Sequence, residues 1–172
     1  MQQCLEGDTT AYRKLYERYS KAMYNTALRI VNKNADAEDV LQEAFTDAFM
    51  QLKTFQQKST FGAWLKQIVV YKSIYKVKSN KLFFDDITTL EDHKEDEVHN
   101  GPDPELTVQK VKEAMQQLPD GYRTVLSLYL LEGYDHEEIA EILQVAHVTV
   151  RTQYIRAKNK LVEILKAVNV YE

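Results

Sequence analysis

The feature that most constrains this chain is an acidic interruption at residues 80–105, NKLFFDDITTLEDHKEDEVHNGPDPE. It carries nine acidic and two basic side chains, contains Gly101, Pro102 and Pro104, and shows no helical period. A structureless loop longer than about 12–15 residues is uncommon inside a compact domain. The sequence therefore predicts a flexible acidic linker between two domains, which occupy residues 1–79 and 106–172.

On both sides of this segment the apolar residues recur at helical spacing. The expected helices lie at residues 9–31, 37–52 and 60–78 of the first domain and at residues 106–117, 121–132, 135–144 and 147–167 of the second. The first is expected to be capped by Asp8 or Thr9 and the second by Asp36. No segment has the pattern of a strand. The expected fold class is all-α, with two small helical bundle domains.

Composition narrows the class of protein. The single cysteine, Cys4, cannot form an internal disulfide, which fits a reducing compartment. No apolar run approaches the roughly 20 residues of a membrane helix, and the first residues lack the apolar stretch of a signal peptide. We therefore expect a cytoplasmic protein with no direct membrane insertion.

The net charge of −4 conceals a segregated distribution. Residues 1–79 carry 12 basic and 8 acidic side chains, a net of +4, whereas the linker has a net of −7 and residues 106–172 a net of −1. Phosphate groups are attracted by a local basic surface rather than by the mean charge. The acidic average therefore does not exclude nucleic-acid binding.

Residues 135–161, DHEEIAEILQVAHVTVRTQYIRAKNKL, predict two helices joined by a tight turn. The polar face expected for the second helix consists of Arg151, Gln153, Arg156, Lys158 and Lys160. A short helix that backs a basic helix can place side chains in a DNA major groove. The alternative is an ordinary amphipathic hairpin with a solvated basic face.

The end of the third expected helix, VVYKSIYKVKSNK, places lysines between tyrosines. Lys72, Lys76 and Lys78 alternate with Tyr71 and Tyr75. Lysines neutralise phosphates, and aromatic rings between them can stack on unpaired bases. We expect nucleic-acid contact here, with a solvated helix end as the alternative, because cations also favour the negative end of the helix dipole.

Residue chemistry alone does not decide the function of two other polar surfaces of the first domain. The loop KTFQQKST at residues 53–60 supplies amide and hydroxyl groups that could hold a flipped base, although an ordinary connection is the simpler interpretation. The second helix presents an outward face of Asp39, Gln42, Glu43 and Asp47. This face would repel DNA and could meet a basic protein partner, or it is plainly solvated.

The chain offers little for catalysis. Its four histidines, His93, His99, His136 and His147, are scattered, and no cysteine joins them at metal-ligand spacing. There is no phosphate-cradling glycine loop and no nucleophile elbow. We therefore expect no enzyme activity of its own, no metal, no cofactor and no small-molecule substrate.

Three segments together resemble the bacterial extracytoplasmic-function (ECF) sigma factors of the sigma-70 family, the two-domain initiation subunits of RNA polymerase. DAEDVLQEAFTDAF (residues 36–49) and STFGAWLKQIV (residues 59–69) are similar to parts of conserved region 2. LPDGYRTVLSLYLLEGYDHEEIAEIL, followed by VTVRTQYIRAKNKL, is similar to region 4. The resemblance covers nearly the whole chain outside the linker.

The resemblance implies a role for each domain. The first would bind the clamp helices of the polymerase's largest subunit and open the minus-ten promoter element. The second, with its helix-turn-helix, would bind the flap of the other large subunit and read the minus-thirty-five element. An anti-sigma factor is a further implied partner.

It also implies site residues by position. The implied core polymerase-binding residues are Asp39, Gln42, Glu43 and Asp47. The implied minus-ten DNA-binding residues are Gln56, Gln57, Lys58, Ser59, Thr60, Trp64, Lys72, Tyr75, Lys76 and Lys78. The implied minus-thirty-five DNA-binding residues are His147, Thr149, Arg151, Thr152, Ile155, Arg156 and Lys158.

The chain departs from the family pattern at four positions. Tyr71 and Tyr75 stand where the family often has Asn or Asp. Gln144 replaces a usual turn glycine, and Ala146 stands near the start of the recognition helix, where loss of a capping serine removes about 1 kcal/mol. The rival functions are a two-domain regulator that binds duplex DNA without polymerase and a helical enzyme or scaffold.

Overall fold

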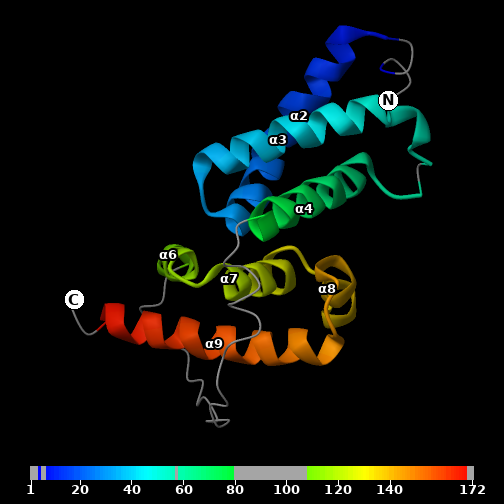
Figure 1. The fold of residues 1–172 in the computed structure, drawn as a ribbon. Helices are drawn as coiled ribbons and strands as arrows, with labels where there is room; N and C mark the ends of the chain where they lie inside the picture. Colours follow the sequence, from blue (N-terminus) through cyan, green and yellow to red (C-terminus); the bar gives the residue numbers. More distant parts are fainter. Residues whose placement is uncertain (1–3, 5–6, 57, 80–107, 170–172) are drawn as a thin grey trace. The chain divides into compact units, whose positions relative to one another are not determined.

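The computed structural model describes residues 4, 7–56, 58–79 and 108–169. Across these residues the regular structure is helical and contains no strand (Figure 1), so the all-α prediction is confirmed there. The chain divides into two compact units, Met1–Ser79 and Asn80–Glu172. Gln57 and the acidic linker predicted at residues 80–105 lie outside the described residues.

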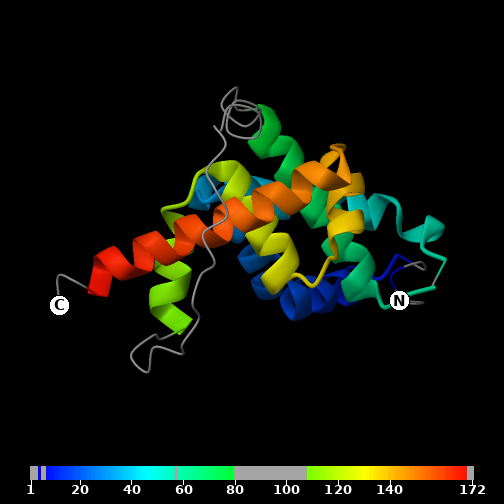
Figure 2. The ribbon, with the colours of Figure 1, turned by 90° about the horizontal axis from the view of Figure 1, so that it is seen from below.

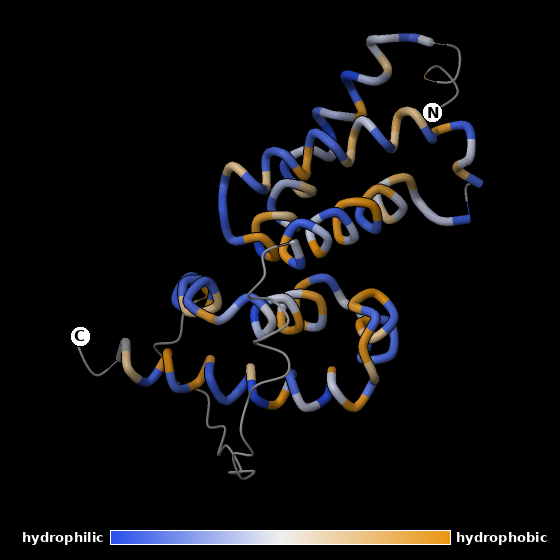
Figure 3. The backbone as a smooth tube through the Cα atoms, in the orientation of Figure 1, coloured by the Kyte–Doolittle hydropathy of each residue, from blue (hydrophilic) through white to orange (hydrophobic). Residues whose placement is uncertain are grey.

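The first unit is built from three long helices, each of which contacts the other two. They are α2 (Thr9–Val31), α3 (Asn34–Met50) and α4 (Phe61–Ser79), with a short 3₁₀ turn, η1 (Leu52–Thr54), after α3. Hydrophobic and hydrophilic residues interleave along each helix (Figure 3), as amphipathic helices require. Fully buried side chains such as Ile30, Val40 and Leu65 form the centre of this bundle.

The N-termini of α2 and α3 can be compared with the capping predictions. Asp8 caps α2 as expected, because its carboxylate accepts a hydrogen bond from the Thr10 amide at 2.8 Å. The prediction for α3 is wrong: the helix begins at Asn34, and Asp36 lies within its first turn. The Ala37 amide donates to the Lys33 carbonyl at 2.9 Å, so the backbone is already helical before Asp36.

A layer of aromatic rings joins the helices of the first unit. Tyr12 packs on Phe49 and Tyr16 on Phe45, each with ring centroids 4.8 Å apart. At the start of α4, a Cβ atom placed on Gly62 would lie only 2.8 Å from Cε1 of Tyr19. The lack of a side chain at this position therefore allows α2 and α4 to approach closely.

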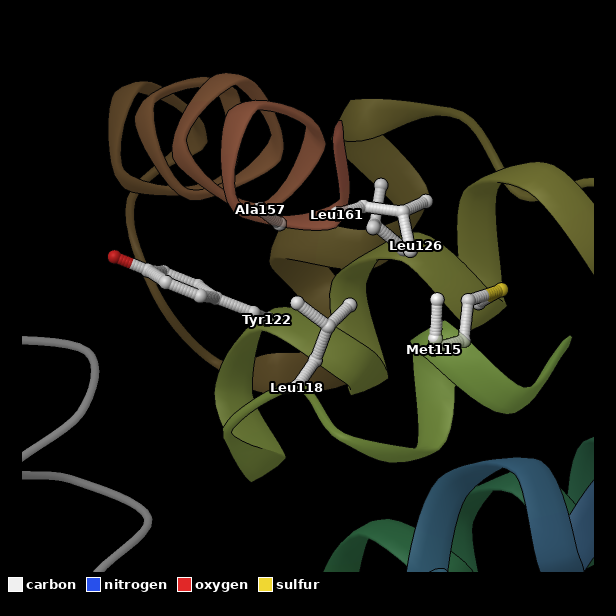
Figure 4. Packing of buried hydrophobic residues seen from close by; sticks show 7 residues of the cluster. Met115, Leu118, Tyr122, Leu126, Ala157 and Leu161 are labelled. Atoms are coloured by element: carbon white, nitrogen blue, oxygen red, sulfur yellow. The ribbon is translucent and has the colours of Figure 1, made fainter. Parts of the chain in front are cut away.

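The second unit is also helical within the described residues. Its elements are α6 (Val108–Gln116), α7 (Asp120–Leu126), the π-helical segment η2 (Ser127–Leu131), α8 (His136–Leu143) and α9 (His147–Asn169). The long helix α9 packs against α6, α7 and α8 (Figures 1 and 2). In Figure 4, side chains from α6, α7 and α9 meet in one apolar cluster that includes Met115, Leu126 and Leu161.

The helix predicted at residues 121–132 is not uniform. After Leu126 the backbone widens into the π-helical turn η2, and the Glu132 amide donates to the Ser127 carbonyl at 3.0 Å. The extra residue of a π-turn changes the direction in which the following side chains point from the helix axis. As a result Leu128 is fully buried, whereas Leu130 and Leu131 are exposed.

A cap stands at each end of α8, and the second one forms the turn to α9. Asp135 accepts hydrogen bonds from the amides of Glu137 and Glu138, and the Glu138 carboxylate accepts one from the Asp135 amide, which completes a capping box. Gln144 ends α8 in the left-handed region, with φ 56° and ψ 45°. The tight turn predicted from the sequence is therefore present, with a strained residue at its corner.

Candidate functional site

The first candidate surface is the outward face of α3, where the four residues predicted to bind polymerase lie. Asp39, Gln42 and Glu43 are exposed, and Asp47 is partly exposed. They recur at spacings of three, one and four residues, which keeps them on one side of a helix. The predicted face is therefore a continuous polar surface.

Two lysines of α4, predicted to contact DNA, reach this same face. Lys72 Nζ lies 2.7 Å from Asp47 Oδ2 and 3.3 Å from Glu43 Oε2. Lys76 Nζ lies 3.0 Å from Asp39 Oδ2 and 3.6 Å from Asp36 Oδ1. Four carboxylates and two ammonium groups leave a net charge of −2 here. Residues assigned to two sites thus form one ion-pair network.

The network also explains the lysine pKa shifts. The hydrogen bond to Asp47, assisted by Glu43, raises the pKa of Lys72 above its ordinary 10.5 against a smaller opposing effect of burial. The hydrogen bond to Asp39 raises the pKa of Lys76 in the same way. By contrast, burial lowers the pKa of Lys78. Lys72, Lys76 and Lys78 of α4 therefore do not form one equivalent cationic stripe.

The second candidate surface is the loop between η1 and α4. Gln56, Lys58, Ser59 and Thr60 are exposed, and the Thr60 hydroxyl accepts a hydrogen bond from the Ala63 amide at 3.2 Å, which caps α4. Only part of the predicted base-binding loop can therefore be placed, since Gln57 is outside the described residues.

An aromatic wall stands beside this loop. The ring of Phe55 lies 5.0 Å from that of Trp64 at an interplanar angle of 32°, and Phe61 lies 5.8 Å from Trp64. Trp64 is one of the implied minus-ten residues, and Phe55 belongs to the loop at residues 53–60 that is expected to hold a flipped base. The contact between the two rings places the aromatic part of that loop against the start of α4.

A third feature of α4 is the exposure of its tyrosines. Tyr71 is 54% exposed and Tyr75 is 78% exposed. Ser73, Ile74 and Val77 of the same stretch are buried. Tyr75 was a predicted DNA-binding residue, and the structure places it and Tyr71 on an open surface.

The fourth candidate surface is the outward side of α9. His147, Arg151, Thr152 and Ile155 are exposed, while Thr149, Arg156 and Lys158 are partly buried. Of the two other residues expected on this basic face, Lys160 is exposed, whereas Gln153 is only 2% exposed, so the placement of Gln153 is wrong. It lies three residues after Val150 and four before Ala157, both buried, and therefore belongs to the inward stripe of the helix.

A cluster of rings, not predicted from the sequence, fixes α9 relative to the helices before it. The Tyr129 ring stacks on His136 at 4.7 Å and 19°, and Tyr154 of α9 lies 4.7 Å from Tyr129 and 5.1 Å from His136. Burial, with a contribution from Tyr129, raises the pKa of Tyr154. The cluster joins η2, α8 and α9, and so orients the exposed side of α9.

Among the helices in the described part of the chain, none combines the length and apolarity needed to cross a bilayer.

Comparison with known families separates the chain into the same two parts. A family model described as sigma-70 region 2 matches residues 15–82, and one described as sigma-70, region 4 matches residues 109–161. Together they cover more than two thirds of the chain.

Curated relatives match over almost the full length. The RNA polymerase sigma-H factor of Pseudomonas aeruginosa is 29% identical over 93% of this chain and 89% of its own length. The ECF RNA polymerase sigma-E factor of Haemophilus influenzae is 29% identical over 91% and 88%. The ECF RNA polymerase sigma factor SigW of Bacillus subtilis is 26% identical over 94% and 92%.

Solved structures support the fold. The sigma factor RpoE from Bartonella quintana, crystallised with the anti-sigma factor NepR, is 24% identical, with a TM-score of 0.56 over 92% of this chain and 98% of that one. CnrH, in complex with the cytosolic domain of CnrY, gives 24% identity and a TM-score of 0.54 over 96% and 94%. With both sigma-70 regions present in order and ECF factors as full-length relatives, the chain belongs to the ECF sigma factors of the sigma-70 family.

Proposed function

We propose that this protein is an initiation factor that binds core RNA polymerase, recognises promoter DNA through both domains and promotes strand opening. The observation that carries the proposal is the order of the two sigma-70 regions along one chain, with region 2 almost wholly in the first compact unit and region 4 in the second. It acts as a specificity subunit and has no catalytic activity by itself. Its expected location is the cytoplasm, where it needs neither metal nor cofactor.

The face of α3 is the proposed contact with core polymerase. Asp39, Gln42, Glu43 and Asp47 form a surface whose net negative charge suits a basic partner, and the proposed partner is the clamp helices of the largest subunit. Lys72 and Lys76 supply cations to the same surface, so a polymerase cation would have to compete with them. An exposed ion pair contributes at most about 1 kcal/mol to stability, so a polymerase cation could displace Lys72 or Lys76 at a small cost in free energy.

The loop before α4 and the adjoining helix are the proposed minus-ten site. Polar groups of the loop stand beside the aromatic wall of Phe55 and Trp64, which suits a base removed from the stack. The proposed contacts are Gln56, Gln57, Lys58, Ser59, Thr60, Trp64, Tyr75 and Lys78, with Lys72 and Lys76 able to reach phosphate only by leaving their carboxylate partners.

The N-terminal half of α9 is the proposed minus-thirty-five reader. In helix-turn-helix proteins the first turns of the recognition helix contact base edges. Exposed Arg151, Thr152 and Ile155 fit that position, with His147, Thr149, Arg156 and Lys158 beside them. Phosphate contacts would position the helix, and base contacts would give specificity.

A protein inhibitor is a further proposed partner. The similar sigma factor RpoE of Bartonella quintana was crystallised with an anti-sigma factor. We propose that this chain is held inactive by a protein of the same class until released.

Transcription in vitro with purified core polymerase across a promoter library tests the proposal. Transcripts that start at defined positions only when this chain is added are expected. If core polymerase combined with this chain gives no promoter-dependent transcript, the proposal is refuted. A gel shift separates the rival regulator, since tight specific binding to duplex DNA by the free chain would favour that function instead.

A further inference from the structure

Two of the lysines that the sequence assigns to phosphate contact are neutralised within the first unit. Lys72 and Lys76 of α4 lie within 3.6 Å of carboxylates on α3. Each carboxylate weakens the attraction of its lysine for a phosphate group. Cations that are free to bind a polyanion must therefore be sought on the other helices of this unit.

The outward side of α2 carries such cations. Lys14, Arg18 and Lys21 are exposed and recur at spacings of four and three residues, which keeps them on one side of the helix. In the part of the chain that the structure describes, no carboxylate forms an ion pair with any of the three. We call these three residues the α2 basic line.

Packing of the domain does not account for this line. Met23, one of the buried residues of α2, is nine residues from Lys14, which is two and a half helical turns, so the two side chains point in opposite directions. A helix side that is simply solvated carries charges of both signs that pair with each other. Here Glu17 is the only acid of the whole helix.

One end of the α2 basic line adjoins the loop proposed to hold a flipped base. The Arg18 guanidinium carbon lies 5.6 Å from the centre of the Tyr19 ring. That ring packs on Phe61, with ring centroids 5.4 Å apart, in the first turn of α4. Phe61 directly follows Thr60, the last residue of the loop. A single aromatic ring therefore connects the line to the start of α4, where the loop ends.

The length of the line suits one strand of DNA. Lys14 and Lys21 are seven residues apart, which is about 10 Å along the helix axis at about 1.5 Å per residue. The charges of one duplex strand follow each other about every 3.4 Å along its axis, so the line spans about three nucleotides. An acidic protein surface would also attract these cations, but the neighbouring loop favours the strand that supplies the flipped base.

We propose that the α2 basic line binds the sugar–phosphate backbone of the promoter strand next to the base held at the loop. Its ligands are phosphate groups, so it positions the strand and reads no base. The inference rests on the proposed function. It adds Lys14, Arg18 and Lys21, none of which is among the site residues implied by the family resemblance.

The test compares variants in holoenzyme assembled with core polymerase. Lys14→Gln with Lys21→Gln removes two charges of the line. Lys112→Gln with Lys166→Gln removes two charges from exposed positions of the second unit and is the matched control. Each holoenzyme binds a promoter fragment selected in the library experiment, with an unpaired minus-ten strand, over a series of salt concentrations. A second fragment carries uncharged methylphosphonate linkages on both sides of the flipped base.

We expect the line variant to bind the first fragment roughly tenfold to fiftyfold more weakly at about 0.1 M salt. Its slope of log affinity against log salt should be smaller by about two, because each phosphate contact contributes about one. The control pair should stay within about twofold of wild type. On the methylphosphonate fragment, wild type and line variant should bind equally, and the affinity for core polymerase without DNA should not change.

Trp64 fluorescence during urea unfolding shows whether the first domain of each variant is folded. If the double variant is not folded, Lys14→Gln and Lys21→Gln are measured separately, and each should lower the salt slope by about one. This keeps the test independent of the stability of the double variant.

Four results would overturn the α2 basic line as a phosphate site. They are unchanged affinity and slope in the line variant, an equal loss in the control pair, a loss that persists on the methylphosphonate fragment, and weaker binding to core polymerase without DNA. The last result would identify an acidic protein surface as the partner. If wild-type holoenzyme transcribes normally in any of these cases, only this inference fails. If it directs no promoter-dependent transcription, the proposed function fails as well.

Discussion

At the scale of single residues, close contacts decide what each position tolerates. Gly62, the second residue of α4, lies beside the ring of Tyr19, which is itself packed on Phe61 with ring centroids 5.4 Å apart. The ring cannot yield without disturbing that contact. A methyl group at position 62 is therefore expected to strain the α2–α4 interface.

Gly62→Ala should lower the free energy of unfolding of the first domain by about 1–3 kcal/mol, the cost of overpacking. Trp64 is the only tryptophan of the chain, so its fluorescence during urea unfolding reports this domain. Ala63→Ser, at an exposed neighbouring position, is the control and should change stability by less than about 0.5 kcal/mol. Equal stability of Gly62→Ala and wild type would contradict the close contact.

Lys72 provides a second residue-scale prediction, which concerns pH. Lys72→Met should lower the stability of the first domain by up to about 1 kcal/mol at pH 8, since it removes the ion pairs to Asp47 and Glu43. The pKa of Lys72 is higher in the folded chain than its ordinary 10.5. The stabilisation is therefore complete below about 10.5 and is lost as the pH rises through the folded pKa.

The measurement is the difference in unfolding free energy between wild type and Lys72→Met at several pH values. The difference should vanish above the folded pKa of Lys72. Lys72→Arg is the matched control, because a guanidinium group stays charged there and should keep its advantage over Met. A difference that persists unchanged at high pH would assign the effect to packing of the lysine stem instead.

At the scale of elements, the corner between α8 and α9 holds a strained residue. Gln144 has φ 56°, in the left-handed region that favours glycine. A side chain there costs roughly 1 kcal/mol. The turn glycine typical of the family is thus missing where the backbone still adopts a glycine conformation.

Gln144→Gly should stabilise the second domain by about 1 kcal/mol, because the left-handed strain disappears. Slower amide hydrogen exchange in α8 and the first turns of α9 is the readout, since these helices open together when the corner frays. Gln144→Val, a branched residue in the same conformation, should have the opposite effect. Faster exchange in the glycine variant would show that the glutamine side chain makes a compensating contact.

At the scale of the whole molecule, the proposed function divides between two compact units. Arg151→Ala should weaken recognition of the upstream element by about 1–3 kcal/mol if its guanidinium group reaches a base, without reducing binding to core polymerase. Footprinting of the upstream element and co-purification with core polymerase measure the two effects separately. An unchanged footprint would remove Arg151 from the reading surface.

Variants of the α3 face should show the reverse pattern, with weaker binding to core polymerase. Reversing the charge of Asp39 and Glu43 should impair co-purification with core polymerase, but it also removes lysine partners within the domain. Gln42→Lys is the cleaner variant, because it adds a positive charge to the same face without deleting an acid of the network. Normal co-purification of Gln42→Lys would count against α3 as the polymerase contact.

The sequence by itself was sufficient for the helical elements, most of their ends, and the resemblance of both domains to sigma factor regions. These depend on local properties: the apolar period along a helix, the cap at Asp8, and motifs contiguous in the chain. Only tertiary structure determined which side of each helix is free. Lys72 is paired with carboxylates 25 and 29 positions away, and Gln153 is buried by neighbours on other helices. Such contacts depend on how the helices pack. The spacing of residues along the sequence gives the direction of each side chain around its own helix axis, but it does not show which neighbouring helix covers that side chain.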